Sequence, residues 1–200
     1  MKHIKDTVIT SQTINKSEFI THLVPIDNEV QAKEYLLKLK KEHSFANHIC
    51  YALICNNQQT TRSSDDKEPA RTAGIPILNV LIKNDLDNCL CAIIRYFGGI
   101  KLGSGGLIRA YSSSAAQAIN EATITIPTIA KENIIQVPYD LYDKINYLLT
   151  INDIKIIDTQ FDLNILITYI SFNDELIEKI NQLSSGKIKY LSQKEITIEI

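Results

Sequence analysis

The stretch Arg95-Tyr-Phe-Gly-Gly-Ile-Lys-Leu-Gly-Ser-Gly-Gly-Leu-Ile-Arg109 holds five of the seven glycines of this 200-residue chain. Glycine lacks a Cβ atom, so it permits positive φ angles and lets other groups approach the backbone closely. The apolar residues 88–95 predict a strand before this run, and residues 107–119 predict a helix after it. We expect Gly105 and Gly106 to start that helix with exposed N–H groups at the positive end of its dipole, an arrangement that suits an anion.

The arginines of the chain concentrate in the same region. All four precede or end the glycine-rich run, at positions 62, 71, 95 and 109, and the other 17 basic residues are lysines. The planar fork of arginine matches carboxylate and phosphate groups. The predicted phosphate- or nucleic-acid-binding residues are therefore Arg95, Gly98, Gly99, Lys101, Gly103, Ser104, Gly105, Gly106 and Arg109. In the alternative interpretation the glycines only relieve steric conflict in a tight connection, since neither a Walker A nor a GxGxxG pattern is present.

A second polar stretch, residues 62–74, carries three acidic side chains. These carboxylates are close enough in sequence to hold Mg²⁺ through water, to pair with Arg95 and Arg109 across a cleft, or to be solvated in a passive loop. With neighbouring polar residues they give a predicted cleft lining of His48, Asp65, Asp66, Glu68, Thr72 and Tyr111.

The same region contains residues of the types used in hydrolase triads and in base stacking. His48 with Ser63 or Ser64 lacks the nucleophile elbow of a hydrolase triad, so no catalytic residue is assigned. The aromatic rings of Tyr96, Phe97 and Tyr111 either stack on bases or belong to the core.

Composition and charge set limits on the protein class. The chain is 44% hydrophobic and 22% charged, as in an ordinary soluble globular protein. Its longest apolar run, residues 89–94, is too short to span a membrane, and no signal-peptide region follows the polar N-terminus, so we expect a cytoplasmic location. Residues 1–130 hold 14 basic and 12 acidic side chains, whereas residues 131–200 hold 7 and 11. A polyanion should therefore favour the N-terminal part.

The four cysteines are predicted to be buried structural residues rather than metal ligands. Cys50, Cys55, Cys89 and Cys91 form no CxxC pair. Together with His48 they show no standard zinc-ligand spacing, so we interpret them as small core residues and assign no metal or cofactor.

The order of strand-like and helical segments along the chain predicts an α+β protein with two domains, residues 1–130 and 131–200. The motif Leu-x-x-Lys-Ile-Asn-x-Leu occurs at 141–148 and again at 176–183. Each copy lies in a helical segment between two strand-like segments, which predicts a ferredoxin-like βαββαβ domain. Its expected elements are strands at 134–139, 154–157, 165–170 and 187–191 and helices at 140–149 and 173–183. In the N-terminal domain we expect strands at 16–25, 47–55, 88–95 and 123–129, a helix from an N-cap at Asp27 to residue 42, a polar loop at 56–72, a helix near 77–82 and the helix to 122.

At these residues the sequence resembles the YigZ/IMPACT family. The matching pieces are His43-Ser-Phe-Ala-Asn-His48, Ser64-Asp-Asp-Lys-Glu-Pro69, Thr72-Ala-Gly-Ile-Pro-Ile-Leu78 and Arg95 through Tyr111. Two places depart from the family pattern, which has glycine where Lys67 stands and Ser-Gly where Ala70-Arg71 stand. The resemblance covers the whole chain.

The resemblance implies an N-terminal fold like domain 2 of ribosomal protein S5 and a C-terminal fold like the terminal domains of elongation factor G. Both precedents belong to translation and bind RNA or ribosomes. Eukaryotic Impact proteins restrain a kinase of translation initiation by competing for its activator, and no enzymatic activity is firmly attached to the family. The leading hypothesis is a non-enzymatic regulator that binds RNA, nucleotide or ribosome phosphates. The alternatives are an enzyme acting on a phosphorylated small molecule, with Asp65, Asp66 or Glu68 as base or metal ligand, and a regulator that binds an acidic protein partner.

Overall fold

The computed structural model describes residues 1–200 and divides into two compact units, Met1–Ile126 and Pro127–Ile200. The division lies four residues before the predicted boundary at 130. The reason is that strand β8 (Pro127–Val137) runs without interruption and pairs from its first residue with strand β11 (Lys189–Glu199). The two strands expected at 123–129 and 134–139 are therefore mostly one strand, preceded by the short β7 (Ile124–Thr125).

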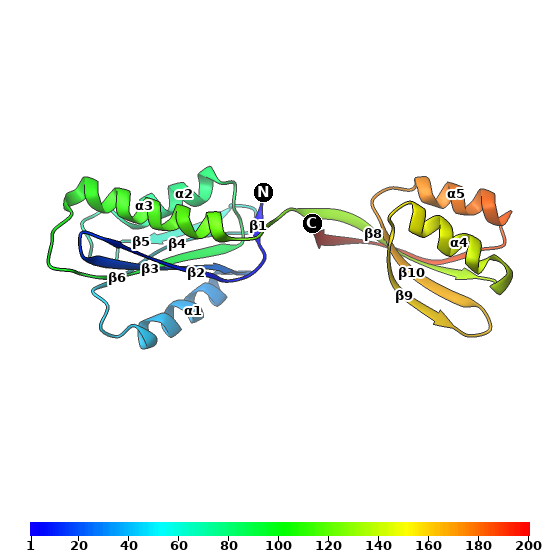
Figure 1. The fold of residues 1–200 in the computed structure, drawn as a ribbon, viewed down its shortest axis with the longest axis horizontal. Coiled ribbons are helices and arrows are strands. Elements are labelled where there is room, and N and C mark those ends of the chain that lie inside the picture. Colours follow the sequence, from blue (N-terminus) through cyan, green and yellow to red (C-terminus); the bar gives the residue numbers. More distant parts are fainter. The chain divides into compact units, whose positions relative to one another are not determined.

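The N-terminal unit is built on a five-stranded antiparallel sheet with the order β2-β3-β6-β4-β5. Helices α2 and α3 cover one face of this sheet and α1 covers the other (Figure 1). A separate two-stranded sheet pairs β1 with β7. The elements are β1 (His3–Ile4), β2 (Val8–Ile14), β3 (Ser17–Pro25), α1 (Glu29–Glu42), β4 (His48–Cys55), β5 (Thr60–Ser64), α2 (Gly74–Lys83), β6 (Cys89–Tyr96) and α3 (Gly103–Glu121).

The central strands are buried on both faces, because each face of the sheet is covered by at least one helix. All residues from Cys89 to Ile94 are fully buried, and all four cysteines are free and buried. Burial raises the pKa of the Cys50 thiol to about 12 and that of Cys91 to about 12. The interpretation of the cysteines as small core residues is confirmed, because all four side chains are buried.

Three local predictions for the N-terminal unit are wrong. Helix α1 is capped by Asn28 rather than Asp27, because the Asn28 side chain accepts the N–H groups of Val30 and Gln31. Strand β5 lies inside the segment expected to be a loop. Helix α3 begins at Gly103, two residues before the expected start.

The C-terminal unit contains β8, α4 (Tyr139–Ile151), β9 (Lys155–Phe161), β10 (Ile165–Ser171), α5 (Glu175–Ser184) and β11. The elements follow one another in the order predicted from the repeat. They form a four-stranded antiparallel sheet with the order β11-β8-β10-β9. Both helices pack on one face of it, through Leu141 and Ile145 from α4 and Leu176 and Ile180 from α5. The last leucine of the second motif, Leu183, is 40% exposed and does not belong to this core. None of the five helices combines the length and the apolar character needed to cross a membrane.

Candidate functional site

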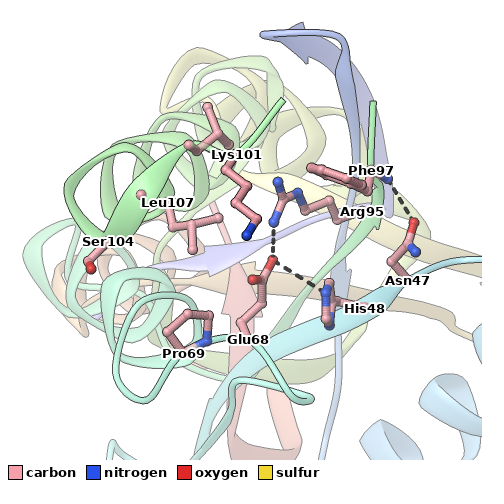
Figure 2. Close-up of a pocket in the computed structure, with 11 residues that line it drawn as sticks. Asn47, His48, Glu68, Pro69, Arg95, Phe97, Lys101, Ser104 and Leu107 are labelled. Carbon is pink, nitrogen blue, oxygen red and sulfur yellow. Dashed lines mark hydrogen bonds and ion pairs between the residues drawn. The ribbon is translucent and has the colours of Figure 1, made fainter. Parts of the chain in front are cut away.

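A pocket of about 480 Å³ lies in the N-terminal unit, beside the start of α3 (Figure 2). Its lining combines the beginning of β4, the end of β6, the turn at 68–69 and the glycine-rich run that leads into α3. The lining residues are Asn47, His48, Glu68, Pro69, Arg95, Phe97, Lys101, Leu102, Gly103, Ser104 and Leu107.

A buried ion pair forms the floor of the pocket. Arg95 Nη1 donates to Glu68 Oε1 at 2.6 Å, and both side chains are at most 5% exposed. The Tyr111 hydroxyl donates to the same oxygen at 2.8 Å. Burial strongly raises the pKa of Tyr111, so its hydroxyl remains a donor. The charge of Glu68 is therefore met inside the protein by two donors. Tyr111 is a core residue beneath the pocket, and its prediction as a cleft-lining residue is wrong.

Arg95 is consequently not the freely available cation that its sequence position suggests. Its Nη2 atom lies 3.3 Å from Ser17 Oγ, and its guanidinium carbon is 5.4 Å and 5.5 Å from the ring centres of Phe19 and Phe97. The Nε–H group is buried and has no partner. Arg95 lines the pocket, but its side chain is only 5% exposed and is directed at Glu68 (Figure 2).

The tautomer of His48 is fixed by a backbone contact. Its Nδ1 atom lies 2.8 Å from the carbonyl oxygen of Asp66, and a carbonyl can only accept, so Nδ1 carries the proton. Its other ring nitrogen, Nε2, lies 3.9 Å from Glu68 Oε1, a carboxylate oxygen of the pocket lining.

The other two acidic residues of the loop, Asp65 and Asp66, accept hydrogen bonds from backbone N–H groups. The Asp65 carboxylate accepts the N–H groups of Arg71, Ala73 and Gly74 at 2.7, 3.0 and 2.8 Å, which caps the start of α2. The Asp66 carboxylate accepts the Ile49 N–H at 2.7 Å.

These contacts turn the two aspartates away from the pocket, and neither pairs with Arg95 or Arg109. The Thr72 hydroxyl donates to the Pro69 carbonyl at 2.7 Å and is also outside the lining. The prediction that Asp65, Asp66 and Thr72 line the cleft is wrong. The protein has no group of three or more His, Cys, Asp or Glu side chains placed to share a metal ion.

At both places where the sequence departs from the expected family pattern, the loop contains a residue with a left-handed backbone. Lys67 and Arg71 have φ angles of 71° and 64°. This left-handed conformation is the one that glycine adopts without strain, and a residue with a Cβ atom pays about 1 kcal/mol for it. The Asp65 and Asp66 contacts hold the loop in place despite this cost.

We expect Asp65→Asn to lower the free energy of unfolding by about 2 kcal/mol at neutral pH, because charge-assisted hydrogen bonds to three N–H groups are weakened or lost. Burial opposes ionisation of Asp65, but those N–H groups outweigh it and hold the pKa of this carboxyl below its ordinary value. Its contribution is therefore complete above the pKa of the unfolded chain and is lost as the pH falls through the folded-state pKa. Urea unfolding of both proteins between pH 7 and 3 measures this. A difference that stays constant with pH would refute the capping role.

The start of α3 faces the pocket without a side-chain cap. Its N-cap residue, Leu102, makes no capping hydrogen bond, and Gly103 has a φ angle of 68°. Gly103 and Ser104 are exposed and line the pocket, beside the exposed Lys101, which forms no salt bridge. The first N–H groups of a helix have no partner within it, so this end is a favourable place for an anion.

The remaining predicted residues are divided by the first turn of α3. Gly106 and Arg109 line a second pocket of about 330 Å³, with Ile14, Asn15, Leu102, Ala110 and Ser113. Gly98, Gly99 and Gly105 line neither pocket. The structure thus brings together Arg95, Lys101, Gly103, Ser104, His48 and Glu68, and it separates Arg109 from them.

Sequence analysis missed part of the lining. Asn47 and Pro69 line the pocket and are next to predicted residues in the sequence. The Asn47 side chain accepts the Phe97 N–H at 2.7 Å, which links the residue before β4 to the residue after β6. For Phe97 the sequence allows either a stacking role or a core position. The residue is 44% exposed and lines the pocket, whereas Tyr96 packs against the core on the α1 side.

Comparison with known proteins identifies the family. The Impact N-terminal domain matches residues 15–119. The IMPACT family member YigZ of Escherichia coli is 32% identical over 194 residues, covering 94% of this chain and 95% of its own. An IMPACT family member of Haemophilus influenzae is 34% identical over 197 residues, covering 92% of each chain. YvyE of Bacillus subtilis is 47% identical over 108 residues, which is 54% of this chain and only 50% of YvyE.

A crystal structure of a hypothetical protein superposes with a TM-score of 0.60 and 31% identity over 96% of both chains. The resemblance in sequence is thereby confirmed, and the chain belongs to the IMPACT family.

Proposed function

We propose that this protein is a non-enzymatic, translation-associated regulator that binds the phosphate groups of RNA, a nucleotide or the ribosome in the pocket at the start of α3. The observation that carries the proposal is the convergence of three phosphate-binding features on that pocket. These are the uncapped helix start at Gly103, the unpaired Lys101, and the Arg95 guanidinium, which lines the pocket beside Glu68.

The role in translation rests on the family resemblance and on the expected folds. The βαββαβ element order and the strand order β11-β8-β10-β9 support a ferredoxin-like C-terminal domain like those of elongation factor G. The N-terminal unit is the part proposed to resemble domain 2 of ribosomal protein S5. Fold analogy alone is a weak argument for function, so the pocket remains the main support.

The charge balance of the pocket favours a short anionic segment. Glu68 is the one acidic residue in the lining, and its charge is met by Arg95 and Tyr111. The net positive contribution comes from Lys101 and the α3 dipole. The exposed ring of Phe97 at the rim offers a flat apolar surface on which a base can stack.

We expect Lys101→Ala to weaken binding of uridine 5′-monophosphate and of ribosomal RNA about fivefold at low salt, because one charge-assisted contact is removed. The slope of the logarithm of affinity against the logarithm of salt concentration should fall by about 0.7 for single-stranded RNA. Filter binding at two salt concentrations measures both quantities. Lys41→Ala is the matched control, since Lys41 is exposed at the end of α1 on the opposite face of the sheet. Equal affinities of the wild type and Lys101→Ala would refute the proposal.

A second candidate function is chemistry on a phosphorylated small molecule. The observation that favours it is the pairing of His48 and Glu68 in the pocket lining, where Nε2 and Oε1 lie 3.9 Å apart as in an acid–base pair. Asp65 and Asp66, the bases considered from the sequence, are turned away and drop out of this candidate. Turnover of phosphate monoesters that His48→Ala abolishes while phosphate affinity survives would establish an enzyme instead of a binding protein.

A further inference from the structure

The two pockets at the start of α3 share one wall. Leu102 lines both of them, with Gly103 and Ser104 on the first side and Gly106 and Arg109 on the second. From position 103 to position 109 the helix rises about 9 Å, at 1.5 Å per residue. The first turn of α3 is therefore a ridge with a basic residue in each flanking pocket, Lys101 on one side and Arg109 on the other.

Arg109 is available to a ligand, unlike two of the other arginines. Arg95 is paired with Glu68, and Arg62 Nη2 lies 3.5 Å from Glu29 Oε2. Arg109 is exposed and forms no salt bridge. Its Nη1 atom lies 3.5 Å from the place where a Cβ atom on Gly105 would stand, so the guanidinium lies back along the first turn of the helix.

The second pocket has the composition of an anion site. Its polar groups are Asn15, Arg109 and Ser113, and no acidic side chain lines it. The first pocket has the one acidic residue, which is neutralised within the protein. A phosphate in either pocket therefore meets positive charge or hydrogen-bond donors without an opposing carboxylate.

We propose that single-stranded RNA crosses the first turn of α3, with one phosphate in the first pocket beside Lys101 and a following phosphate in the second pocket beside Arg109. This inference rests on the proposed function and makes it more specific. Because Lys101 lines the first pocket and Arg109 the second, a ligand with successive phosphates can place one phosphate beside each cation. Two small concave pockets separated by a helical ridge fit a flexible single strand, and the exposed Phe97 ring adds the aromatic surface that such sites combine with basic groups.

The test compares 5′-phosphorylated oligouridylates of one to six nucleotides by isothermal titration calorimetry on the full-length chain. In the wild type we expect affinity to rise at least tenfold from the mononucleotide to the hexanucleotide. In Arg109→Ala the ratio of the two affinities should fall to about one. In Lys101→Ala affinity should fall at both lengths. Arg62→Ala is the control and should retain the wild-type ratio, and thermal unfolding verifies that each exposed-site variant is folded.

The possible failures are distinguishable. Absence of binding to the wild type at every length would overturn the proposed function and this inference together. Mononucleotide binding that depends on Lys101 but does not strengthen with length, or a length dependence that Arg109→Ala leaves intact, would overturn only the inference. Equal competition by polyaspartate would also overturn it, since an acidic peptide would then use the same charges without RNA.

Discussion

Arg95→Met is expected to lower the free energy of unfolding of the N-terminal unit by about 3–5 kcal/mol, the usual range when one partner of a buried ion pair is removed. The reason is that Glu68 would stay buried with Tyr111 as its one remaining close donor. Urea unfolding followed by circular dichroism measures the loss. The double variant Arg95→Met with Glu68→Gln should recover a substantial part of it, because no charge is then left buried.

Comparison of Arg95→Met with the double variant also distinguishes a role of Arg95 in stability from a role in ligand binding alone. If Arg95 served only the ligand, Arg95→Met would unfold at the wild-type urea concentration. A loss below about 1 kcal/mol, within the range of exposed pairs, would contradict the buried pairing. Glu68→Gln alone keeps the hydrogen-bond geometry but removes the charge that Arg95 meets, so it should also destabilise the unit.

Gly98→Ala is expected to lower the free energy of unfolding by about 3 kcal/mol, at the upper end of the cost of overpacking. A Cβ atom at this position would stand 1.8 Å from the Lys16 carbonyl oxygen and 2.0 Å from its carbon. Both are backbone atoms of the turn between β2 and β3, so no side-chain rotation can relieve the collision. The Gly98 N–H also lies 3.3 Å from Ser17 Oγ, which holds the two segments together.

Gly105→Ala is the matched control from the same glycine-rich run. The nearest heavy atom to its added Cβ is Arg109 Nη1 at 3.5 Å, an ordinary contact. Alanine is favoured over glycine inside a helix by about 1 kcal/mol, so this variant should be as stable as the wild type or more so. Equal urea midpoints for Gly98→Ala and Gly105→Ala would contradict the close approach of Gly98 to Lys16.

Most of the fold could be predicted because its elements follow hydrophobic patterns. The buried run at Cys89–Ile94 and the repeated Leu-x-x-Lys-Ile-Asn-x-Leu motif mark the central strand β6 and both C-terminal helices. Strand β5 escaped prediction because Thr60-Thr-Arg-Ser-Ser64 is entirely polar and pairs along one edge alone, so no apolar alternation marks it. The predicted start of α3 was wrong because the N-cap position holds Leu102, whose side chain cannot cap a helix, and a glycine follows it.

The predicted site residues are neighbours in the sequence, but the structure distributes them between two pockets. Local sequence gives the residue types near Arg95, yet its partner Glu68 lies 27 residues away, and only the packed sheet brings them together. Arg109 and Lys101 were grouped because they are eight residues apart in one motif. The helical geometry of α3 instead places Arg109 in the second pocket, since position 109 follows the face of Gly106 rather than that of Ser104.

The carboxylates of Asp65 and Asp66 hold the loop after β5 in place, and this affects which substitutions the loop surface tolerates. Because Asp65 and Asp66 fix the loop, positions 67 and 71 keep a glycine-like backbone while carrying long basic side chains. Neither position lines a pocket at the start of α3. Exchanges between neutral and cationic residues at these two points can therefore change the charge on the protein surface, while the shape of the pockets at the start of α3 stays the same.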